Sequence, residues 1–236
     1  MTLPVLVLTS DVHAWLVPAV LHQLNKHWQP RPRVIIAGYS PIPNLPPWAE
    51  FFKIGEFVDY PVGKWSDGAR LAVNSMPERF ILLLDDYLVL RRVDTAAIEI
   101  IEDWMTGRDD IFRFDLSTDR LYAPGAKHAG YIGRLDLLET AHDVPYQVSA
   151  QPGIFDREKL LEIMVKSESP WDFEIMGSYR MQEYPQWRVF GTRQAPVRCK
   201  IAVNKGKLDL ETPWQYPAAI LAPEDVSELK AKGLIP

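Results

Sequence analysis

The sequence predicts an α/β fold, with a mostly parallel central sheet and helices on both faces of that sheet. Short, continuously hydrophobic strands are expected at 5–8 and 33–38, and the residues over about 14–28 between them have helical periodicity. A third apolar run, at 80–84, leads into a further helical pattern. Strands that alternate with helices in this way typically pair in parallel and are covered on both faces.

Local signals place the helices of the first half. Pro18 is tolerated only in a first helical turn, so the first helix is expected to begin later than its apolar stripe. The Trp-Ser-Asp-Gly stretch ending at Gly68 suggests a turn, followed by a short helix over about 69–75. Asp94 is expected to cap a helix. The buried face of that helix carries Ala97, Ile101, Trp104 and Met105.

The second half alternates short strands, loops and helices. A strand is expected at 111–114, and the stretch 118–152 is interpreted as loops and short strands over a cleft. Asp156 can cap a helix that runs to about 165, and Ser169, which precedes a proline, can begin the next. The last helix is expected over 223–232, with acids at its start and lysines at its end, as the helix dipole favours.

Length and composition indicate one globular domain over 1–236. The formal net charge of −5 argues against a global electrostatic grip on nucleic acid or an anionic membrane. Cys199 is the only cysteine, which excludes an internal disulfide and a cysteine-based zinc site. No apolar run approaches the roughly 20 residues of a membrane span. We therefore expect a soluble, cytoplasmic protein.

Two adjacent acids, Asp85 and Asp86, follow directly on the most hydrophobic strand. Ligands of open α/β sheets bind beyond the carboxyl ends of the strands, so a central strand would deliver both carboxylates into a cleft. There they could hold a divalent cation that neutralises a pyrophosphate. The alternative is a solvated turn at the strand end, which aspartate also favours.

A second pair of acids follows the predicted helix start at Ser169. Asp172 falls where a capping-box acid sits, which is its structural interpretation. Glu174 lies one turn into the helix beside two large aromatic residues, and partial burial there would raise the pKa of its carboxylate towards that of a useful general base. An exposed helix glutamate is the alternative interpretation.

A local excess of basic residues between 188 and 207 suggests an anion site in an otherwise acidic chain. Within it, Lys205 belongs to a loop that could close over a diphosphate. The alternative is a solvated face of alternating strand residues. The basic residues of the segment are Arg188, Arg193, Arg198, Lys200, Lys205 and Lys207.

Four stretches of this chain resemble the small GT-A-type glycosyltransferases of bacteria and bacteriophages, related to glycosyltransferase family 2. Together they span most of positions 5–180, and the last is the most specific. They are Thr9-Ser10-Asp11, Leu82-Leu83-Leu84-Asp85-Asp86-Tyr87, Gln151-Pro152-Gly153-Ile154-Phe155 and Ser169-Pro170-Trp171-Asp172-Phe173-Glu174-Ile175-Met176-Gly177-Ser178.

The resemblance implies a Rossmann-like GT-A domain that uses a nucleotide-sugar, a UDP-sugar above all, together with Mn²⁺ or Mg²⁺. It also implies a nucleotide-sugar-binding half at 1–117 and an acceptor and catalytic half at 118–236. It places Thr9, Ser10 and Asp11 at the end of the first strand, facing the nucleoside. The region of Asp67 and Arg70 would face the same group.

The same resemblance assigns the acids. Asp85 and Asp86 occupy the place of the Asp-any-Asp motif that holds the metal, and Glu174 or Asp172 the place of the catalytic base. Tyr87 stands where a strict motif has its last acid, so the metal would rest on Asp86 alone. The late metal-binding histidine common in related enzymes is absent from the sequence.

These observations lead to a glycosyltransferase that acts with inversion on an acceptor hydroxyl of a polysaccharide or of DNA bearing hydroxylated bases. Two alternatives remain open. A non-catalytic nucleotide- or sugar-binding module would bind UDP without turnover. A metallophosphoesterase would use the Asp-any-His of Asp11 and His13, but it needs further clustered histidine ligands that the sequence does not supply.

Overall fold

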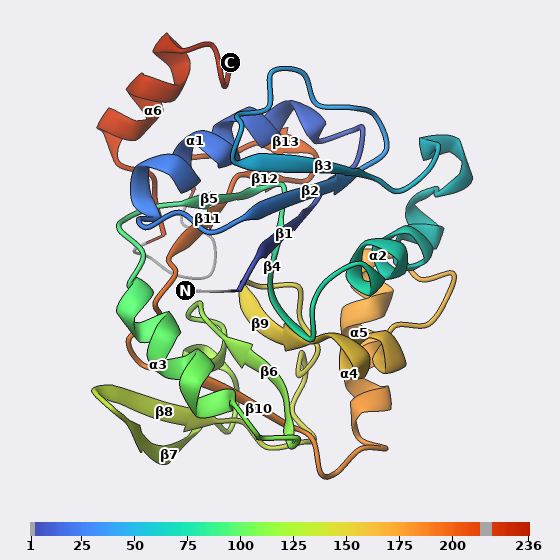
Figure 1. Cartoon of the computed structure of the whole chain (residues 1–236), viewed down its shortest axis with the longest axis vertical. Coiled ribbons are helices and arrows are strands. Elements are labelled where there is room, and N and C mark those ends of the chain that lie inside the picture. The colour runs from blue at the N-terminus through green and yellow to red at the C-terminus, as the bar shows by residue number, and fades with distance from the viewer. Residues whose placement is uncertain (1–2, 213–218) are drawn as a thin grey trace.

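The computed structural model describes residues 3–212 and 219–236 and is built around a nine-stranded sheet (Figure 1). In spatial order the strands are β3 (Ala49–Lys53), β2 (Val34–Gly38), β1 (Val5–Leu8), β4 (Arg79–Leu84), β9 (Gly153–Asp156), β6 (Ile111–Asp115), β10 (Arg188–Thr192), β8 (Leu135–Glu139) and β7 (Lys127–Ile132). Two small ribbons pair β5 (Tyr87–Val89) with β11 (Cys199–Ile201), and β12 (Val203–Asn204) with β13 (Lys207–Leu208).

The helices pack on both faces of the sheet. The α-helices are α1 (Val17–His27), α2 (Trp65–Asn74), α3 (Thr95–Met105), α4 (Arg157–Ile163), α5 (Pro170–Met181) and α6 (Pro223–Ala231), with 3₁₀ turns at Ala14–Leu16, Phe57–Asp59, Val62–Lys64 and Arg120–Tyr122. Apolar residues of α1, α3 and α6 join one hydrophobic core, whereas those of α2, α4 and α5 join the other. None of the helices in the described ranges has the length and apolar character to span a bilayer.

Alternation along the strands explains why both faces need a helical cover. In β1, Val5 and Val7 belong to one core and Leu6 and Leu8 to the other, and all four side chains are buried. Because successive strand residues point to opposite faces, a run that is apolar throughout must be covered twice. The structure therefore confirms the predicted α/β fold with helices on both faces.

The strand directions are mostly parallel, with an informative exception. The strands β3, β2, β1 and β4 pair in parallel, as do β6 and β10. The strand β9 lies between β4 and β6 and is antiparallel to both, and β8 is antiparallel to β10 and to β7. A strand from the second half of the chain thus joins two strands of the first half.

The predicted helix caps are present. Asp94 accepts a hydrogen bond from the Ala97 amide at 3.0 Å, and Asp156 accepts one from the Lys159 amide at 3.1 Å. The helix α1 begins at Val17 and holds Pro18 in its first turn, as expected. Each cap satisfies an amide that the helix itself leaves without a partner.

One predicted boundary is wrong. The helix α2 begins at Trp65 rather than near 69, so Gly68 lies inside the helix instead of in a turn before it. The reason is a close approach, since a Cβ at Gly68 would lie 2.7 Å from the hydroxyl oxygen of Tyr39. A larger residue would have to displace the buried Tyr39 side chain, so Gly68 fits this place inside the helix, and its usual meaning as a helix breaker misleads.

Gly153, at the start of β9, provides a test of how tightly the two halves are joined. A Cβ there would lie 2.9 Å from the Nε of Arg113 and 3.1 Å from the carbonyl oxygen of Phe114. We expect Gly153→Ala to lower the free energy of unfolding by about 1–3 kcal/mol, because the backbone oxygen cannot move aside without disturbing the sheet. Urea denaturation measures this change.

The matched control is Gly63→Ala, since a Cβ at Gly63 meets no atom within 4 Å. Its free energy of unfolding should change by less than about 0.5 kcal/mol. Equal stability of the two variants would contradict the packing of β9 between β4 and β6.

Candidate active site

The carboxyl edge of the sheet gathers polar residues from several strands. The strands β1 and β4 end directly before Thr9 and Asp85, and β6 ends in Asp115. Because β9 runs in the opposite direction, its first residue, Gly153, lies at this same edge, opposite Leu82 and Asp115. The segment that precedes β9 is therefore delivered to the edge where the acids lie.

Asp85 ties the end of β4 to the end of β1. Its Oδ2 accepts a hydrogen bond from the Thr9 hydroxyl at 2.6 Å and one from the Ser10 amide at 3.2 Å. The Nδ1 of His13 lies 3.9 Å from its Oδ1. Burial raises the pKa of Asp85, against the lowering effect of these neighbours. The structure thus brings together three predicted site residues: Thr9, Ser10 and Asp85.

The carboxylate of Asp86 accepts fewer hydrogen bonds than that of Asp85 in the described ranges. Its backbone carbonyl accepts a hydrogen bond from the Ala202 amide at 2.7 Å, but its carboxylate accepts none from another side chain in the described part of the chain. Burial, and next the negative charge of Asp85, raise the pKa of Asp86 to about 7. A carboxylate in this state gains from a cation or a hydrogen-bond donor brought by a ligand.

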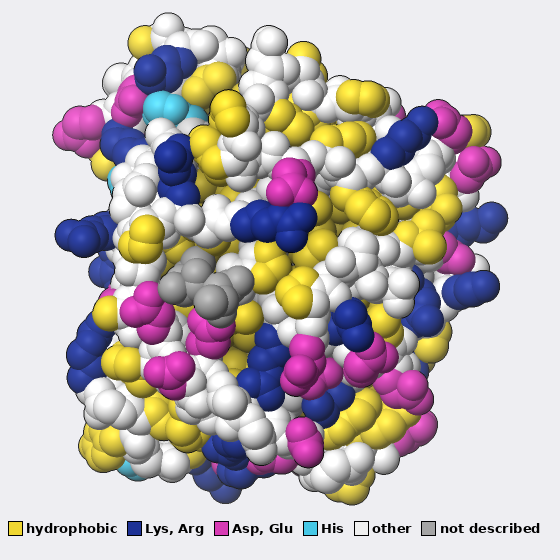
Figure 2. Space-filling model, viewed as in Figure 1, with side chains coloured by type: hydrophobic (Ala, Val, Ile, Leu, Met, Phe, Trp, Pro, Cys, Tyr) yellow, Lys and Arg dark blue, Asp and Glu magenta, His cyan; other side chains and the backbone are white. Residues whose placement is uncertain are grey.

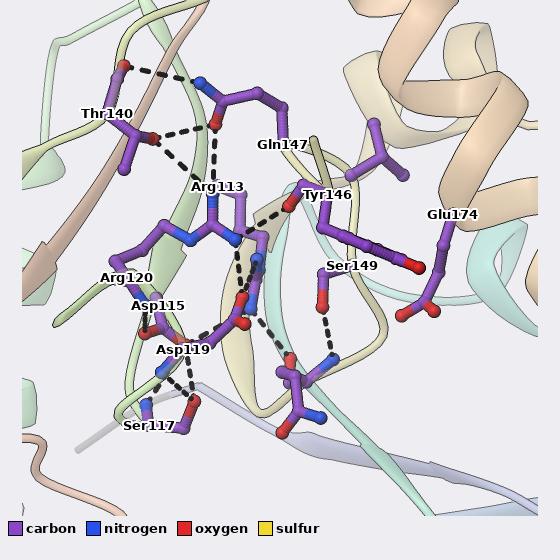
Figure 3. A network of polar contacts seen from close by, with 12 residues as sticks. Arg113, Asp115, Ser117, Asp119, Arg120, Thr140, Tyr146, Gln147, Ser149 and Glu174 are labelled. Carbon is purple, nitrogen blue, oxygen red and sulfur yellow. Dashed lines mark hydrogen bonds and ion pairs between the residues drawn. The ribbon is translucent and has the colours of Figure 1, made fainter. Parts of the chain in front are cut away.

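Glu174 projects from α5 towards the segment that precedes β9 (Figure 3). Its Oε1 accepts a hydrogen bond from the Ala150 amide at 2.7 Å. Burial raises the pKa of Glu174; the Ala150 amide opposes this shift, and the negative charge of Asp119 adds to it. Glu174 is thus a largely buried carboxylate in a fixed orientation with a raised pKa, which are properties of a general base.

Asp172 has a local structural role. Its Oδ2 accepts hydrogen bonds from the Ser169 amide at 3.3 Å and the Ser169 hydroxyl at 2.6 Å, and the Asp172 amide donates to the Ser169 hydroxyl oxygen at 3.1 Å. These contacts complete the capping box of α5 and lower the pKa of Asp172. Of the two candidate bases, Glu174 is the one whose surroundings suit proton transfer.

Tyr87 connects the two groups of acids. Its phenol is buried, and its pKa is raised well above the usual value, first by burial and then by the negative charges of Asp86 and Glu174. Asp119 and Cys199 add to this shift. The carboxylates of Asp86 and Glu174 are therefore within electrostatic range of one buried hydroxyl, although 88 residues separate them in sequence.

Two buried arginines, Arg113 and Arg120, form a network of ion pairs near Glu174 (Figure 3). Arg113 forms ion pairs with Asp115 at 3.2 Å and with Asp119 at 3.3 Å. Arg120 forms an ion pair with Asp119 at 2.8 Å. Buried charges are stable only when paired and hydrogen-bonded, so this network is a rigid unit next to the candidate base. We did not predict this network from the sequence.

The same network fixes the segment before β9. Arg120 donates to the Tyr146 carbonyl oxygen at 2.8 Å and to the Gln147 Oε1 at 3.2 Å. Arg113 donates to the Gln151 carbonyl oxygen at 3.2 Å. The segment is thereby held at both ends around Ala150, whose amide orients Glu174.

A pocket opens beside these groups, between the ends of β6 and β9 and the ribbon of β5 and β11. Its lining includes Ser117, Thr118, Gln151, Arg198, Cys199 and Ile201. Arg198 is the basic side chain among the lining residues, and we call this the Arg198 pocket. Ile201 pairs with Tyr87 across the ribbon, so the pocket adjoins the chain segment that leaves Asp86.

The other predicted nucleoside-facing residues make contacts between loops and helices. Asp11 accepts hydrogen bonds from the Ser40 amide at 3.0 Å and the Ser40 hydroxyl at 2.7 Å, which joins the loops after β1 and β2. Asp67 accepts from the Ser167 amide at 2.7 Å. Arg70 donates to the carbonyl oxygen of Met164 at the end of α4. A role of Asp67 and Arg70 in nucleoside binding stays a prediction without support from these contacts.

The basic segment does not act as one patch. Arg188 is paired with Glu139 at 2.6 Å and Arg193 with Asp136 at 2.8 Å. Lys200 is buried, and Lys205 lies in the tight turn between β12 and β13 with a φ of 50°. Of the six basic residues of this segment, Arg198 is the one among the residues that line the pocket.

In the part of the chain that the structure describes, no group of three His, Cys, Asp or Glu side chains could hold a metal ion. This argues against the preformed two-metal site of a metallophosphoesterase. One free carboxylate, Asp86, still fits Mg²⁺ or Mn²⁺, because Mg²⁺ commonly binds through one or two carboxylates and the phosphates of a substrate.

Comparisons with known proteins give no family assignment. No family model and no curated protein matches the chain. Similar solved structures include a cytidylyltransferase from Leptospira borgpetersenii serovar Hardjo-bovis, with a TM-score of 0.47, 10% identity, and coverage of 98% of this chain and 86% of that one. An active-site mutant of LgtC has a TM-score of 0.40 and 14% identity, covering 68% of this chain and 59% of that one. We draw no functional conclusion from either.

The raised pKa of Asp86 predicts a pH-dependent effect on stability in metal-free buffer. The folded protein keeps a proton on Asp86 up to a pKa of about 7, whereas the unfolded chain releases it near 3.8. Stability contributed by this proton is complete below 3.8 and is lost as the pH rises to about 7. The difference corresponds to about 4 kcal/mol between the two protonation states.

We therefore expect Asp86→Asn to be more stable than the wild type in urea denaturation at about pH 8, by an amount that shrinks towards about pH 5. Asp109→Asn, at an exposed position, is the matched control. A variant at Asp86 that is no more stable than the wild type at the higher pH would show that this carboxylate is well solvated.

Proposed function

We propose that the chain is a glycosyltransferase that moves a sugar from a nucleotide-sugar, a UDP-sugar in the first instance, to an acceptor hydroxyl with inversion. The observation that carries the proposal is that β4 ends before Asp85 and Asp86 at the edge of the sheet where β9 begins, and that Glu174 is bound to the Ala150 amide in the segment before β9. This edge is where open α/β sheets bind their ligands. One acid is suited to the phosphate side of the reaction and the other to proton transfer.

Glu174 is the general base of the proposed reaction. Its carboxylate removes the proton from the acceptor hydroxyl while that oxygen attacks the anomeric carbon from the side opposite the diphosphate. The bond between the anomeric carbon and the diphosphate oxygen breaks, and the diphosphate leaves with the electron pair. The Ala150 amide donates a hydrogen bond to one carboxylate oxygen and so fixes the orientation of the group.

Asp86, with Asp85 next to it, is the proposed holder of a divalent cation. A Mg²⁺ or Mn²⁺ ion bound there would neutralise negative charge on the diphosphate. Asp85 is itself hydrogen-bonded to Thr9 and Ser10, so it supports the end of β4 and leaves Asp86 free for the ion. The raised pKa of Asp86 also means that a nearby cation would favour its ionised form.

The acceptor is better matched by a polysaccharide than by DNA bearing hydroxylated bases. Two residues of the predicted basic segment, Arg188 and Arg193, already form ion pairs with carboxylates of the protein. Acidic and basic side chains are intermixed over the face shown in Figure 2, and the formal net charge is −5. DNA-binding surfaces are strongly positive, and their affinity falls steeply with salt. The proposed reaction takes place in the cytoplasm, or in the host cytoplasm for a phage protein.

A panel of nucleotide-sugars, each with and without Mn²⁺ or Mg²⁺, tests donor use. Binding to the folded state raises the apparent stability by about 2.7 kcal/mol when the ligand is present at about 100 times its Kd. We expect a thermal shift with at least one nucleotide-sugar, and release of its nucleoside diphosphate when an acceptor polysaccharide is added. Binding without release under any acceptor would indicate a non-catalytic binding module.

Glu174→Gln tests the base. We expect turnover to fall by about 10²- to 10⁴-fold, because proton transfer is lost, while donor affinity stays nearly unchanged. Asp172→Asn on the same helix is the matched control, and it should lower the stability of α5 with little effect on turnover. The opposite pattern, loss in Asp172→Asn with full activity in Glu174→Gln, would transfer the role of base to Asp172.

The pH dependence of turnover follows from the same residue. The base must be ionised, and the pKa of Glu174 is raised by burial above its ordinary value of 4.5. The wild-type rate should therefore decline as the pH falls through that raised value. The residual rate of Glu174→Gln should lack this decline, and an unchanged profile would assign the decline to another group.

A further inference from the structure

Tyr146 combines an exposed side chain with an unfavourable backbone conformation. Its φ of 58° lies in the left-handed region, which is costly for a bulky residue and normally favours glycine. The residue is 49% exposed, and its hydroxyl forms no hydrogen bond with the residues that the structure describes. Packing of the side chain therefore does not explain why this conformation is kept.

The buried side chain of Arg120 maintains the conformation of Tyr146. Its Nη2 donates to the Tyr146 carbonyl oxygen and to the Asp119 Oδ2, each at 2.8 Å. Its Nη1 donates to the Oε1 of the following residue, Gln147, at 3.2 Å. Because loss of these contacts would leave a buried guanidinium without partners, the network can impose strain on the backbone of Tyr146.

The ring of Tyr146 points towards the candidate base, Glu174 (Figure 3). Further along the same segment, the Val148 amide donates to the Ser178 hydroxyl oxygen at 3.1 Å, and the Ala150 amide donates to the Glu174 Oε1 at 2.7 Å. The segment that carries Tyr146 is thus bound to the helix that carries Glu174. A molecule that offers a hydroxyl to Glu174 is expected to contact this ring.

The charges near the ring favour a neutral, hydroxylated ligand. The side chain of Asp119 is 17% exposed, and its Oδ1 accepts no hydrogen bond from the described part of the chain. Its negative charge is felt by Glu174, whose pKa it raises. Carboxylates accept hydrogen bonds from sugar hydroxyls, whereas they repel phosphate groups. The C–H groups on the face of a sugar ring can pack against an aromatic side chain.

We propose that Tyr146 contacts the acceptor and that its ring packs against a sugar ring next to the hydroxyl that Glu174 deprotonates. This inference rests on the proposed function for the role of Glu174, and it identifies the acceptor as a neutral carbohydrate. The strained backbone of Tyr146 then has a role in recognition, because it holds the ring where the ligand binds.

Titration with neutral trisaccharides tests this contact without a transfer reaction. The probes are maltotriose, cellotriose, mannotriose and triacetylchitotriose, and ligand-observed NMR measures their affinities. We expect at least one of them to bind the wild type and to bind Tyr146→Phe about as well. The same trisaccharide should bind Tyr146→Gly about 10-fold more weakly, because the aromatic ring is lost.

Tyr146→Gly also separates recognition from stability. Glycine adopts a φ of 58° without strain, so the urea midpoint of this variant should not fall below that of the wild type. Asn44→Gly is the matched control, since Asn44 is exposed and also has a left-handed φ, of 55°. This control should bind the trisaccharide as the wild type does.

Three results would overturn the inference: no trisaccharide binds the wild type, Tyr146→Gly binds as tightly as the wild type, or Tyr146→Phe loses as much affinity as Tyr146→Gly. A single-stranded oligonucleotide bearing 5-hydroxymethylcytosine is the competing probe. If it binds in place of the trisaccharides, and binds Tyr146→Gly more weakly, the ring stacks on a nucleobase and the carbohydrate assignment is wrong.

The acceptor contact and the proposed function fail in different ways. Trisaccharide binding that depends on Tyr146, in a protein that transfers no sugar, would support the contact and contradict the transferase. Sugar transfer with an unchanged acceptor KM in Tyr146→Gly would support the transferase and contradict the contact.

Discussion

The site depends on one constraint, the insertion of antiparallel β9 between β4 and β6. Because β9 runs against its neighbours, Gly153 lies beside the carboxyl ends of both strands, and the segment before it reaches the edge that carries Asp85 and Asp86. A parallel strand in this position would place that segment at the opposite edge. The Arg113 side chain lies so close to Gly153 that a Cβ there would be 2.9 Å from its Nε. The arginine network and the inserted strand therefore pack directly against each other.

The carboxyl groups of the site are buried, which disfavours their ionised forms. Asp85, Asp86 and Glu174 all have raised pKa values, with burial as the main cause. The Nε atoms of Arg113 and Arg120 are buried and have no hydrogen-bond partner among the residues that the structure describes, which adds a desolvation cost. Unfavourable burial of charged groups is common at functional sites. A ligand can offset its cost by binding those groups, and favourable packing elsewhere in the fold keeps the protein stable.

Much of the fold followed from local sequence signals, whereas the site followed only in part. The buried run before Asp85 and the cap at Ser169 are local, and both were predicted correctly. The network around Arg120 was not, because its partners come from a loop with little periodicity, up to 27 residues further along the chain. A signal was present, since Arg113 and Asp115 stand two positions apart in an apolar strand and therefore share one face.

The most direct test of the central claim is a crystal structure of the protein with UDP and Mn²⁺, in which anomalous scattering locates the metal. We expect a manganese ion beside Asp86, the diphosphate bound to that ion, and the carboxylate of Glu174 facing the sugar side of the same cleft. Nucleotide and metal bound at the opposite edge of the sheet, or a diphosphate remote from Asp86, would contradict the proposed function.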